Sequence, residues 1–386
     1  MHSRWLSRFR YYACVIILSG IFTNPAASGM FIKTLNQVEF KELLVKTASV
    51  KNQTLSHFKI AGFEFPVAEI QNVHFKDVHW SNISAKGRIF KNITFSDCKL
   101  ENINYRNVKF DNVVFDNCEL INVVMSQAEV NHATYKNSRI ISTDPNTENN
   151  HRNLSAGKIS FINSELRGLN YYHSKGDFIF EDSKLNDVRG YGLVKGSSIT
   201  IIGSKLNYFD FSDSTLDSLI VRGSSVDESK LNGGIIDSII LENNDFKKFP
   251  IAEGQYKTLT ANKTKNIIIG SSSVVNAEIN NCGDTSDLFL GGMKNFTSIS
   301  ISGCDPSEFV FFDVVGKELK ISNMEAHIFD FENASLDTLV LNNVTIAGKI
   351  ISKNSKIKNY IPHNVKVLDG VKVIDKNSNI KIITTP

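Results

Sequence analysis

A bulky apolar or aromatic residue returns at almost every fifth position between residues 70 and 140 of this chain. A smaller apolar residue stands two positions before each of them, and Asn or Asp usually precedes that one, so the unit reads N-[VIC]-x-[FYL]-x. The bulky residues are Ile70, Phe75, Trp80, Phe90, Phe95, Leu100, Tyr105, Phe110, Phe115, Leu120, Met125, Val130, Tyr135 and Ile140. Neither a helix nor a flat strand aligns residues five apart on one face over such a length. The chain must therefore turn after each unit.

Four such units close a square coil of twenty residues if each unit is a short strand followed by a corner, with both apolar residues pointing inward. The second half of the chain supports this coil length independently, because apolar residues recur there at a spacing of twenty. They are Ile159, Ile179, Ile199, Leu219, Ile239, Leu259, Ile279, Ile299, Leu319 and Leu339. Coils stack at about 4.8 Å, and we expect about thirteen of them. The periodicity predicts an all-β solenoid with about 20 residues per coil.

This unit resembles the repeat of the pentapeptide-repeat family, in which a large residue points inward from the centre of each pentad and a smaller one lies two positions before it. The resemblance implies a right-handed quadrilateral β-helix. Residues 68–142 match the pentad, with Val, Ile or Cys where the family often has Ala, whereas residues 157–350 match the coil length more clearly. Members of this family have unrelated activities, so the resemblance implies the fold and little about function.

The two ends of the array are expected to carry caps, because an uncovered coil frays and pairs with other chains. A capping box at residues 34–37 predicts a short helix over residues 34–48, inside an N-terminal cap of residues 30–67. Residues 352–386 are expected to form a C-terminal cap of short strands, since apolar and polar residues alternate over residues 364–383.

One polar segment interrupts the array. Residues 143–157 contain Pro, Asn and Gly, and the bulky positions shift by one residue across them. We therefore expect a loop insertion at residues 143–157 between two arrays of coils, residues 68–142 and 158–351.

The first residues of the chain have the three parts of a secretory signal. Arg4, Arg8 and Arg10 precede an apolar run at residues 11–22, and small residues follow at positions 26–29. The run is too short for a confident membrane span. We expect residues 1–28 to be a signal peptide and the protein to be periplasmic or secreted, with an uncleaved signal anchor as the alternative.

The net charge of the chain changes when this N-terminal segment is removed. Residues 1–28 hold three of the 43 basic residues and none of the 40 acidic ones, so the remaining chain is neutral. A neutral surface does not steer the protein toward nucleic acid or anionic membranes. We expect no nucleic-acid partner and no stable membrane span after signal removal.

Four cysteines follow the signal segment, and none has the spacing of a zinc ligand set. Cys98 and Cys118 are twenty residues apart, which stacks them inside neighbouring coils within reach of a disulfide. We favour packed thiols there. Cys282 and Cys304 are twenty-two apart and could meet on adjoining coils.

No group of residues indicates catalysis, a metal or a cofactor. Two carboxylate pairs are candidates for general acid/base catalysis, Asp210 with Asp213 and Asp330 with Glu332, but polar residues fill outward positions of any such repeat. His74 and His79 are five apart and are expected on adjacent faces as solvated residues rather than metal ligands. Ser164, Ser183 and Ser204 recur at one place in the coil, which indicates corners. The catalytic, cofactor-binding and metal sites are therefore predicted as none.

Asn-x-Ser/Thr triplets are frequent in this repeat, and they would be glycan sites in a eukaryotic secretory route. We favour hydrogen-bonded ladders of Asn stacked in successive coils. The triplets begin at Asn52, Asn82, Asn92, Asn153, Asn262, Asn295, Asn333 and Asn343.

These observations favour an exported, non-enzymatic interaction or scaffold protein whose long faces bind a protein or a glycan, as a bacterial envelope component or a secreted virulence-type factor. The alternative is a carbohydrate-active β-helix enzyme, which needs a cleft lined with charged residues. The family resemblance adds a third function, DNA mimicry that protects topoisomerases. That function requires a strongly acidic surface, so it ranks last.

Overall fold

The computed structural model describes residues 32–34, 37–46, 49–143, 151–247 and 249–378. The expected signal peptide at residues 1–28 lies outside the described residues. Within them, no helix is long and apolar enough to cross a bilayer.

The described residues form one helix, α1 (Gln37–Lys46), and parallel strands, of which β1 precedes the helix and the others follow it along the chain. Up to residue 189 the strands are β1 (Ile32–Thr34), β2 (Ser49–Glu64), β3 (Glu69–Ser84), β4 (Ile89–Ser96), β5 (Lys99–Asn104), β6 (Lys109–Asp116), β7 (Glu119–Ile121), β8 (Glu129–Lys136), β9 (Arg139–Ile141), β10 (Ser155–Ile162), β11 (Glu165–Asn170), β12 (Lys175–Glu181) and β13 (Lys184–Arg189). Beyond it they are β14 (Ser197–Ile202), β15 (Lys205–Leu206), β16 (Phe209–Asp210), β17 (Thr215–Arg222), β18 (Ser225–Val226), β19 (Ser229–Lys230), β20 (Ile235–Glu242), β21 (Asp245–Phe246), β22 (Phe249–Ala252), β23 (Gln255–Asn262), β24 (Ile267–Gly270), β25 (Ser273–Gly291), β26 (Lys294–Phe312), β27 (Val315–Glu332), β28 (Ser335–Lys353), β29 (Lys356–Val367) and β30 (Lys372–Lys376).

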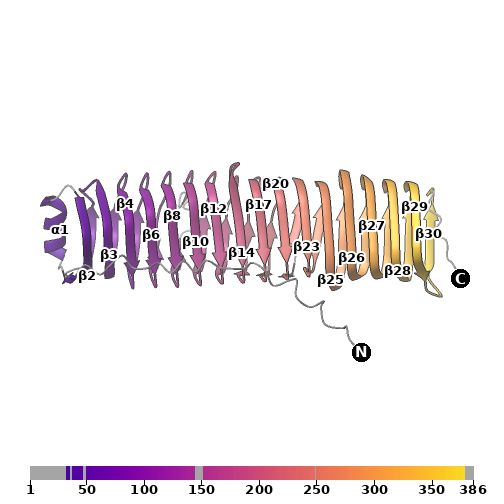
Figure 1. Ribbon diagram of the computed structural model, residues 1–386, viewed down its shortest axis with the longest axis horizontal. Coiled ribbons are helices and arrows are strands. Elements are labelled where there is room, and N and C mark those ends of the chain that lie inside the picture. The colour runs from indigo at the N-terminus through magenta and orange to yellow at the C-terminus, as the bar shows by residue number, and fades with distance from the viewer. Residues whose placement is uncertain (1–31, 35–36, 47–48, 144–150, 248, 379–386) are drawn as a thin grey trace, which may run out of the picture. The chain divides into compact units, whose positions relative to one another are not determined.

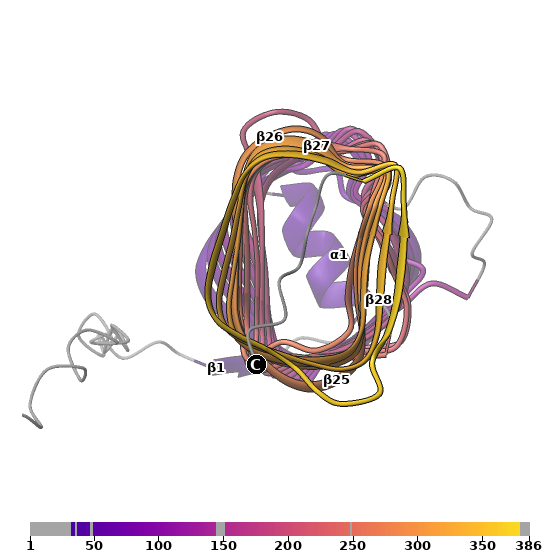
Figure 2. The same ribbon diagram turned by 90° about the vertical axis from the view of Figure 1, so that its right-hand side faces the viewer.

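Each coil hydrogen-bonds in parallel to the next one, so residues about twenty apart lie side by side. Leu55 is aligned with Phe75 and Phe75 with Phe95, and the same column ends with Leu341 beside Pro362. Strands follow one another along the long axis in Figure 1, and the coils superpose into a four-sided outline in Figure 2. The predicted all-β solenoid with about 20 residues per coil is confirmed.

The array is longer than expected, with about 16 turns rather than about thirteen. Strand β2 forms a full coil on β3 inside the expected N-terminal cap of residues 30–67. Strands β29 and β30, inside the expected C-terminal cap of residues 352–386, continue the parallel stacking on β28. The five-residue spacing continues through β2 to the residue after it, with Val50, Leu55, Ile60 and Phe65 buried. The pentad fades in β29 and β30, but their backbone groups still need the neighbouring coil as a hydrogen-bond partner.

The helix α1 covers the first coil and confirms the expected capping helix, although it is shorter than residues 34–48. Thr34 belongs to β1, which pairs with β2, so the helix begins at Gln37. Phe40 and Leu44 of the helix are buried, and the Phe40 ring lies 4.8 Å from that of Phe58. An apolar helix face thus replaces a missing neighbouring coil (Figure 2).

The insertion is narrower than expected. Tyr135 is aligned with Phe161, so this turn of the chain uses 26 residues. Strand β10 already pairs with β8 from Ser155, and Leu154 is buried, which places residues 154–157 in the coil rather than in the loop. Residues 144–150 lie outside the described residues.

The prediction is wrong for two residues of the column that was expected to repeat every twenty residues. Ile159 is aligned with Phe178 rather than Ile179, and Leu259 with Ala277 rather than Ile279. The affected coils are shorter or longer than twenty residues because corners vary in length while the strand register follows the hydrogen bonds.

Six aromatic rings form a continuous column in the core. Phe75, Phe95, Phe115, Tyr135, Phe161 and Phe180 stack with centroids 4.8 to 5.2 Å apart. Neighbouring rings are within 14° of parallel. The ring spacing follows the strand spacing, so each ring contacts the coil before and after it.

Phe115→Ala should therefore destabilise the protein by about 3–5 kcal/mol, because the cavity removes contacts with two coils. Urea unfolding followed by circular dichroism measures the loss. Val114→Ala on the outer side of the same strand is the control, with an expected loss below about 1 kcal/mol. Equal losses for the two variants would contradict the stacked core.

Candidate functional site

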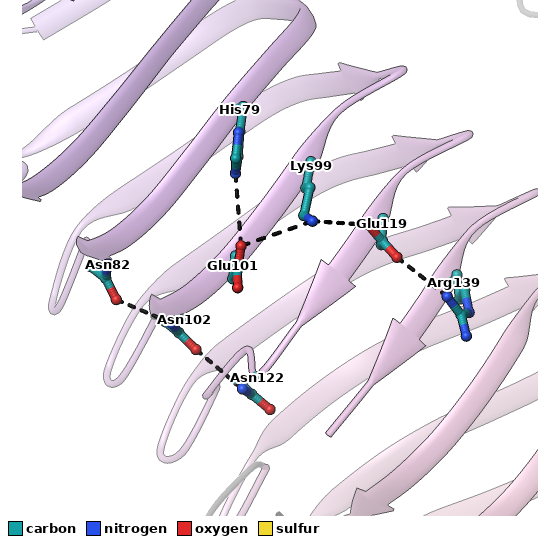
Figure 3. A network of polar contacts seen from close by, with 8 residues as sticks. All are labelled: His79, Asn82, Lys99, Glu101, Asn102, Glu119, Asn122 and Arg139. Carbon is teal, nitrogen blue, oxygen red and sulfur yellow. Dashed lines mark hydrogen bonds and ion pairs between the residues drawn. The ribbon is translucent and has the colours of Figure 1, made fainter. Parts of the chain in front are cut away.

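Asparagines at the corners of the coil form ladders along the outside. Asn102 has a φ of 54°, a left-handed conformation that Asn tolerates better than most residues. Its Nδ2 donates to Asn82 Oδ1 at 3.1 Å, and Asn122 Nδ2 donates to Asn102 Oδ1 at 3.1 Å (Figure 3). The side chain therefore has two roles, turning the backbone and linking three coils.

Several Asn-x-Ser/Thr triplets lie in such ladders. The Asn92 amide donates to Asn72 at 2.9 Å, and the Asn343 amide donates to Asn323 at 3.1 Å. Ladder formation explains these asparagines without a glycan, as the sequence favoured.

Asn102→Gly keeps the turn but removes the ladder, whereas Asn102→Ala removes the ladder and also strains the backbone. We expect the Ala variant to be less stable than the Gly variant by about 1 kcal/mol. Thermal and urea unfolding of the two variants measure this difference. If the Gly variant were the less stable one, the left-handed corner would be refuted.

Charged residues form a second ladder on the outside, shown in Figure 3. Lys99 Nζ lies 3.9 Å from Glu101 and 3.5 Å from Glu119, and Arg139 lies 3.3 Å from Glu119. The carboxylate of Glu101 is also 3.8 Å from His79 Nε2. These side chains are 33 to 51% exposed, so each pair contributes little stability. Their effect is to neutralise charge along this part of the rod.

A hollow of about 310 Å³ opens beside this ladder, lined by His57, Lys59, Asp77, His79, Asp97 and Lys99 among others. His57 Nδ1 lies 2.7 Å from Asp77 Oδ2, the contact by which a carboxylate orients an imidazole. The thiol of Cys98 does not enter the hollow, because Cys98 is buried and its Sγ donates to Phe75 O and Ser96 O. The described residues contain no group of His, Cys, Asp and Glu arranged to hold a metal ion.

One member of each carboxylate pair suggested by the sequence is engaged in a polar contact. Asp210 accepts hydrogen bonds from the backbone N–H and the Oγ of Ser212, at 3.0 and 2.7 Å. Glu332 pairs with Lys353 at 3.2 Å. Burial and the neighbouring Glu332 raise the pKa of Asp330, which lies between Val310 and Ile351 of the adjacent coils. Neither pair lines the hollow.

The corner serines are buried structural residues. Ser138 Oγ accepts from the N–H of Cys118 at 3.0 Å, and Ser164 and Ser183 repeat this bond in the next coils. Each hydroxyl donates to a carbonyl two residues earlier, at 2.7 to 2.9 Å. The structure thus supports corners rather than nucleophiles.

The cysteines extend this serine column. Cys98 and Cys118 are buried free thiols, as the sequence favoured, and the hydrogen bond with Cys98 together with burial raises the pKa of Cys118. Cys282 and Cys304 form a disulfide between adjoining coils. The twenty-residue spacing of Ser138 from Cys118 is the signal by which the sequence could have shown that serines and cysteines share one column.

The structure does not bring His74 and His79 together, because they align with Thr94 and Lys99 respectively. His74 is half-buried, and its Nε2 lies 2.7 Å from Ser96 Oγ. Burial, together with nearby Lys76, lowers the pKa of His74 from 6.5.

Because the pKa of His74 is lowered in the folded protein, the unfolded chain binds a proton at His74 more readily than the folded chain does. The associated stability is complete above pH 6.5 and is lost as the pH falls through the folded-state pKa. We expect wild type to lose more unfolding free energy than His74→Gln between about pH 7.5 and about pH 5. Urea titrations of both proteins at the two pH values measure this, and equal losses would contradict the assignment.

A family model described as pentapeptide repeats matches residues 89–127 in 8 copies. The resemblance seen in the sequence is thereby confirmed. No curated protein matches the chain.

Solved structures with detectable similarity include two trypsin-treated variants of QnrB1, a plasmid-mediated fluoroquinolone resistance protein. The first has 13% identity and a TM-score of 0.21, and the match covers 48% of this chain and 91% of that one. The second has 13% identity, a TM-score of 0.19, and coverage of 47% and 91%. The A-module of the Azotobacter vinelandii mannuronan C-5 epimerase AlgE6 has 9% identity, a TM-score of 0.13, and coverage of 89% and 94%. At these TM-scores the likenesses carry no argument about function.

Proposed function

We propose that this solenoid, which carries pentapeptide repeats, is an exported, non-enzymatic interaction or scaffold protein of the bacterial envelope or a secreted factor. The observation that carries the proposal is the self-pairing of its outward polar groups. Asn102 bonds to Asn82 and Asn122, and Lys99 lies between Glu101 and Glu119. Groups held in this way form rigid faces suited to binding rather than groups free to move protons or attack a substrate.

Two features support export. Residues 1–28 have the composition of a secretory signal. The disulfide between Cys282 and Cys304 is the kind of bond that persists in oxidising compartments such as the periplasm.

Cell fractionation and N-terminal sequencing test export. We expect the protein in the periplasm or medium with an N-terminus close to residue 29, and Ile17→Lys, which interrupts the apolar run, should keep it in the cytosol. A cytosolic wild-type protein with an intact N-terminus would exclude export.

The scaffold role is tested on the purified exported protein. It should retain a partner from envelope or host extracts and should release no reducing or unsaturated ends from a panel of polysaccharides. Retention of nothing across these extracts would count against a scaffold, and new sugar ends would favour the carbohydrate-active enzyme.

A further inference from the structure

The tyrosines of this protein are distributed unevenly between its inside and its outside. Tyr105, Tyr135, Tyr171 and Tyr256 are buried in the core. By contrast, Tyr172, Tyr191 and Tyr208 point outward in three successive coils. Tyr191 is 41% exposed, and it is the only aromatic residue among the most exposed large apolar residues of the described chain.

Tyr191 stands between two glycines that let neighbouring side chains pack closely against the backbone. A Cβ at Gly190 would lie 2.1 Å from the Phe211 ring, and one at Gly192 would lie 2.9 Å from His173 Nδ1. Gly192 also has a φ of 66°, which disfavours other residues. The exposed Tyr191 lies next to Tyr172, and the two ring centroids are 6.2 Å apart.

Charged groups surround the third ring. The Arg189 guanidinium and Lys230 Nζ lie 5.5 and 5.3 Å from the centre of the Tyr208 ring. Asp210 is aligned between Arg189 and Lys230 on the neighbouring strands, and it accepts a hydrogen bond from the Tyr208 hydroxyl at 3.3 Å. Arg189 is held by Asp187 at 2.6 Å, whereas Lys230 forms no ion pair within the described residues.

We name this cluster of Tyr172, Arg189, Tyr191, Tyr208, Asp210 and Lys230 the tyrosine patch. The residues of the patch favour a protein ligand over a nucleic acid or a sugar chain. Two cations accompanied by Asp187 and Asp210 do not make a site for a polyanion such as nucleic acid. The Tyr172 and Tyr191 rings are inclined by 66°, so they cannot both stack on one flat sugar chain. Exposed Tyr with Arg at the centre and polar groups around it is the composition of energetic centres in protein interfaces.

We propose that the tyrosine patch is the docking site for a folded protein partner, which places an apolar side chain against Tyr172 and Tyr191 and a carboxylate against Lys230. This proposal rests on the proposed function as an interaction protein and assigns its binding site. The ammonium group of Lys230 is exposed and hydrogen-bonds to Tyr208 rather than to a carboxylate. It supplies the charge complementarity, and the exposed ring of Tyr191 supplies the apolar contact.

The probe is a photo-crosslinking amino acid placed at position 191 of the full-length protein in its producing cells, with the same probe at Ile235 as the control. Ile235 is 47% exposed on another strand, β20. We expect position 191 to capture one protein that position 235 does not. Capture of a second copy of this chain, or of a glycan, would overturn the proposal.

Binding of the captured protein, once purified, is then measured with single variants. Tyr191→Ala and Lys230→Glu should each weaken binding at least about tenfold, whereas Ile235→Ala should leave it unchanged. Urea midpoints equal to that of wild type establish that the variants are folded. A partner that binds all variants equally would refute the tyrosine patch while the scaffold function stands. Absence of any partner for the wild-type protein would refute the proposed function itself.

Discussion

Parallel hydrogen bonding between successive coils is the constraint on which the rest of this structure depends. Because each strand takes its partners from the coils before and after it, every residue lies beside its counterpart about twenty positions away, as Leu55 lies beside Phe75. A side chain placed at one position is therefore surrounded mainly by side chains at the same position of other coils. Each position of the coil must therefore hold side chains that pack well against the side chains at the same position of the next coil.

Four kinds of interaction between stacked side chains occur in the described columns. Rings stack face to face from Phe75 to Phe180, and corner amides donate to the next amide, as Asn122 does to Asn102. Buried hydroxyls such as Ser164 accept from the N–H of the coil before them. Opposite charges alternate in one outer column, where Glu119 lies between Lys99 and Arg139. Stacking of coils thus orders the core and also pairs part of the charge on the surface.

The tyrosine patch departs from this rule. Its column passes from Tyr172 and Tyr191 to Ser212 in consecutive coils, and the adjacent column alternates Arg189, Asp210 and Lys230. Lys230 contacts the Tyr208 ring and is aligned with Asp210, but it forms no ion pair within the described residues. Elsewhere along the described chain many outward polar groups pair with their counterparts in neighbouring coils, whereas at the tyrosine patch this pairing is incomplete. The patch therefore differs from the ladders as a binding surface.

The sequence by itself determined the coil, because a bulky apolar or aromatic residue at nearly every fifth position fills the inside of a square turn. It also identified the capping helix, the packed thiols and the corner serines. It did not determine the number of turns, the inward residue at Phe178, or the partners of Cys282 and Lys230. Those depend on the length of individual corners, which changes by one or two residues without changing the pattern of types. Only the tertiary structure decides such matters, because hydrogen bonds between coils set the register and bring together residues that the spacing alone leaves apart.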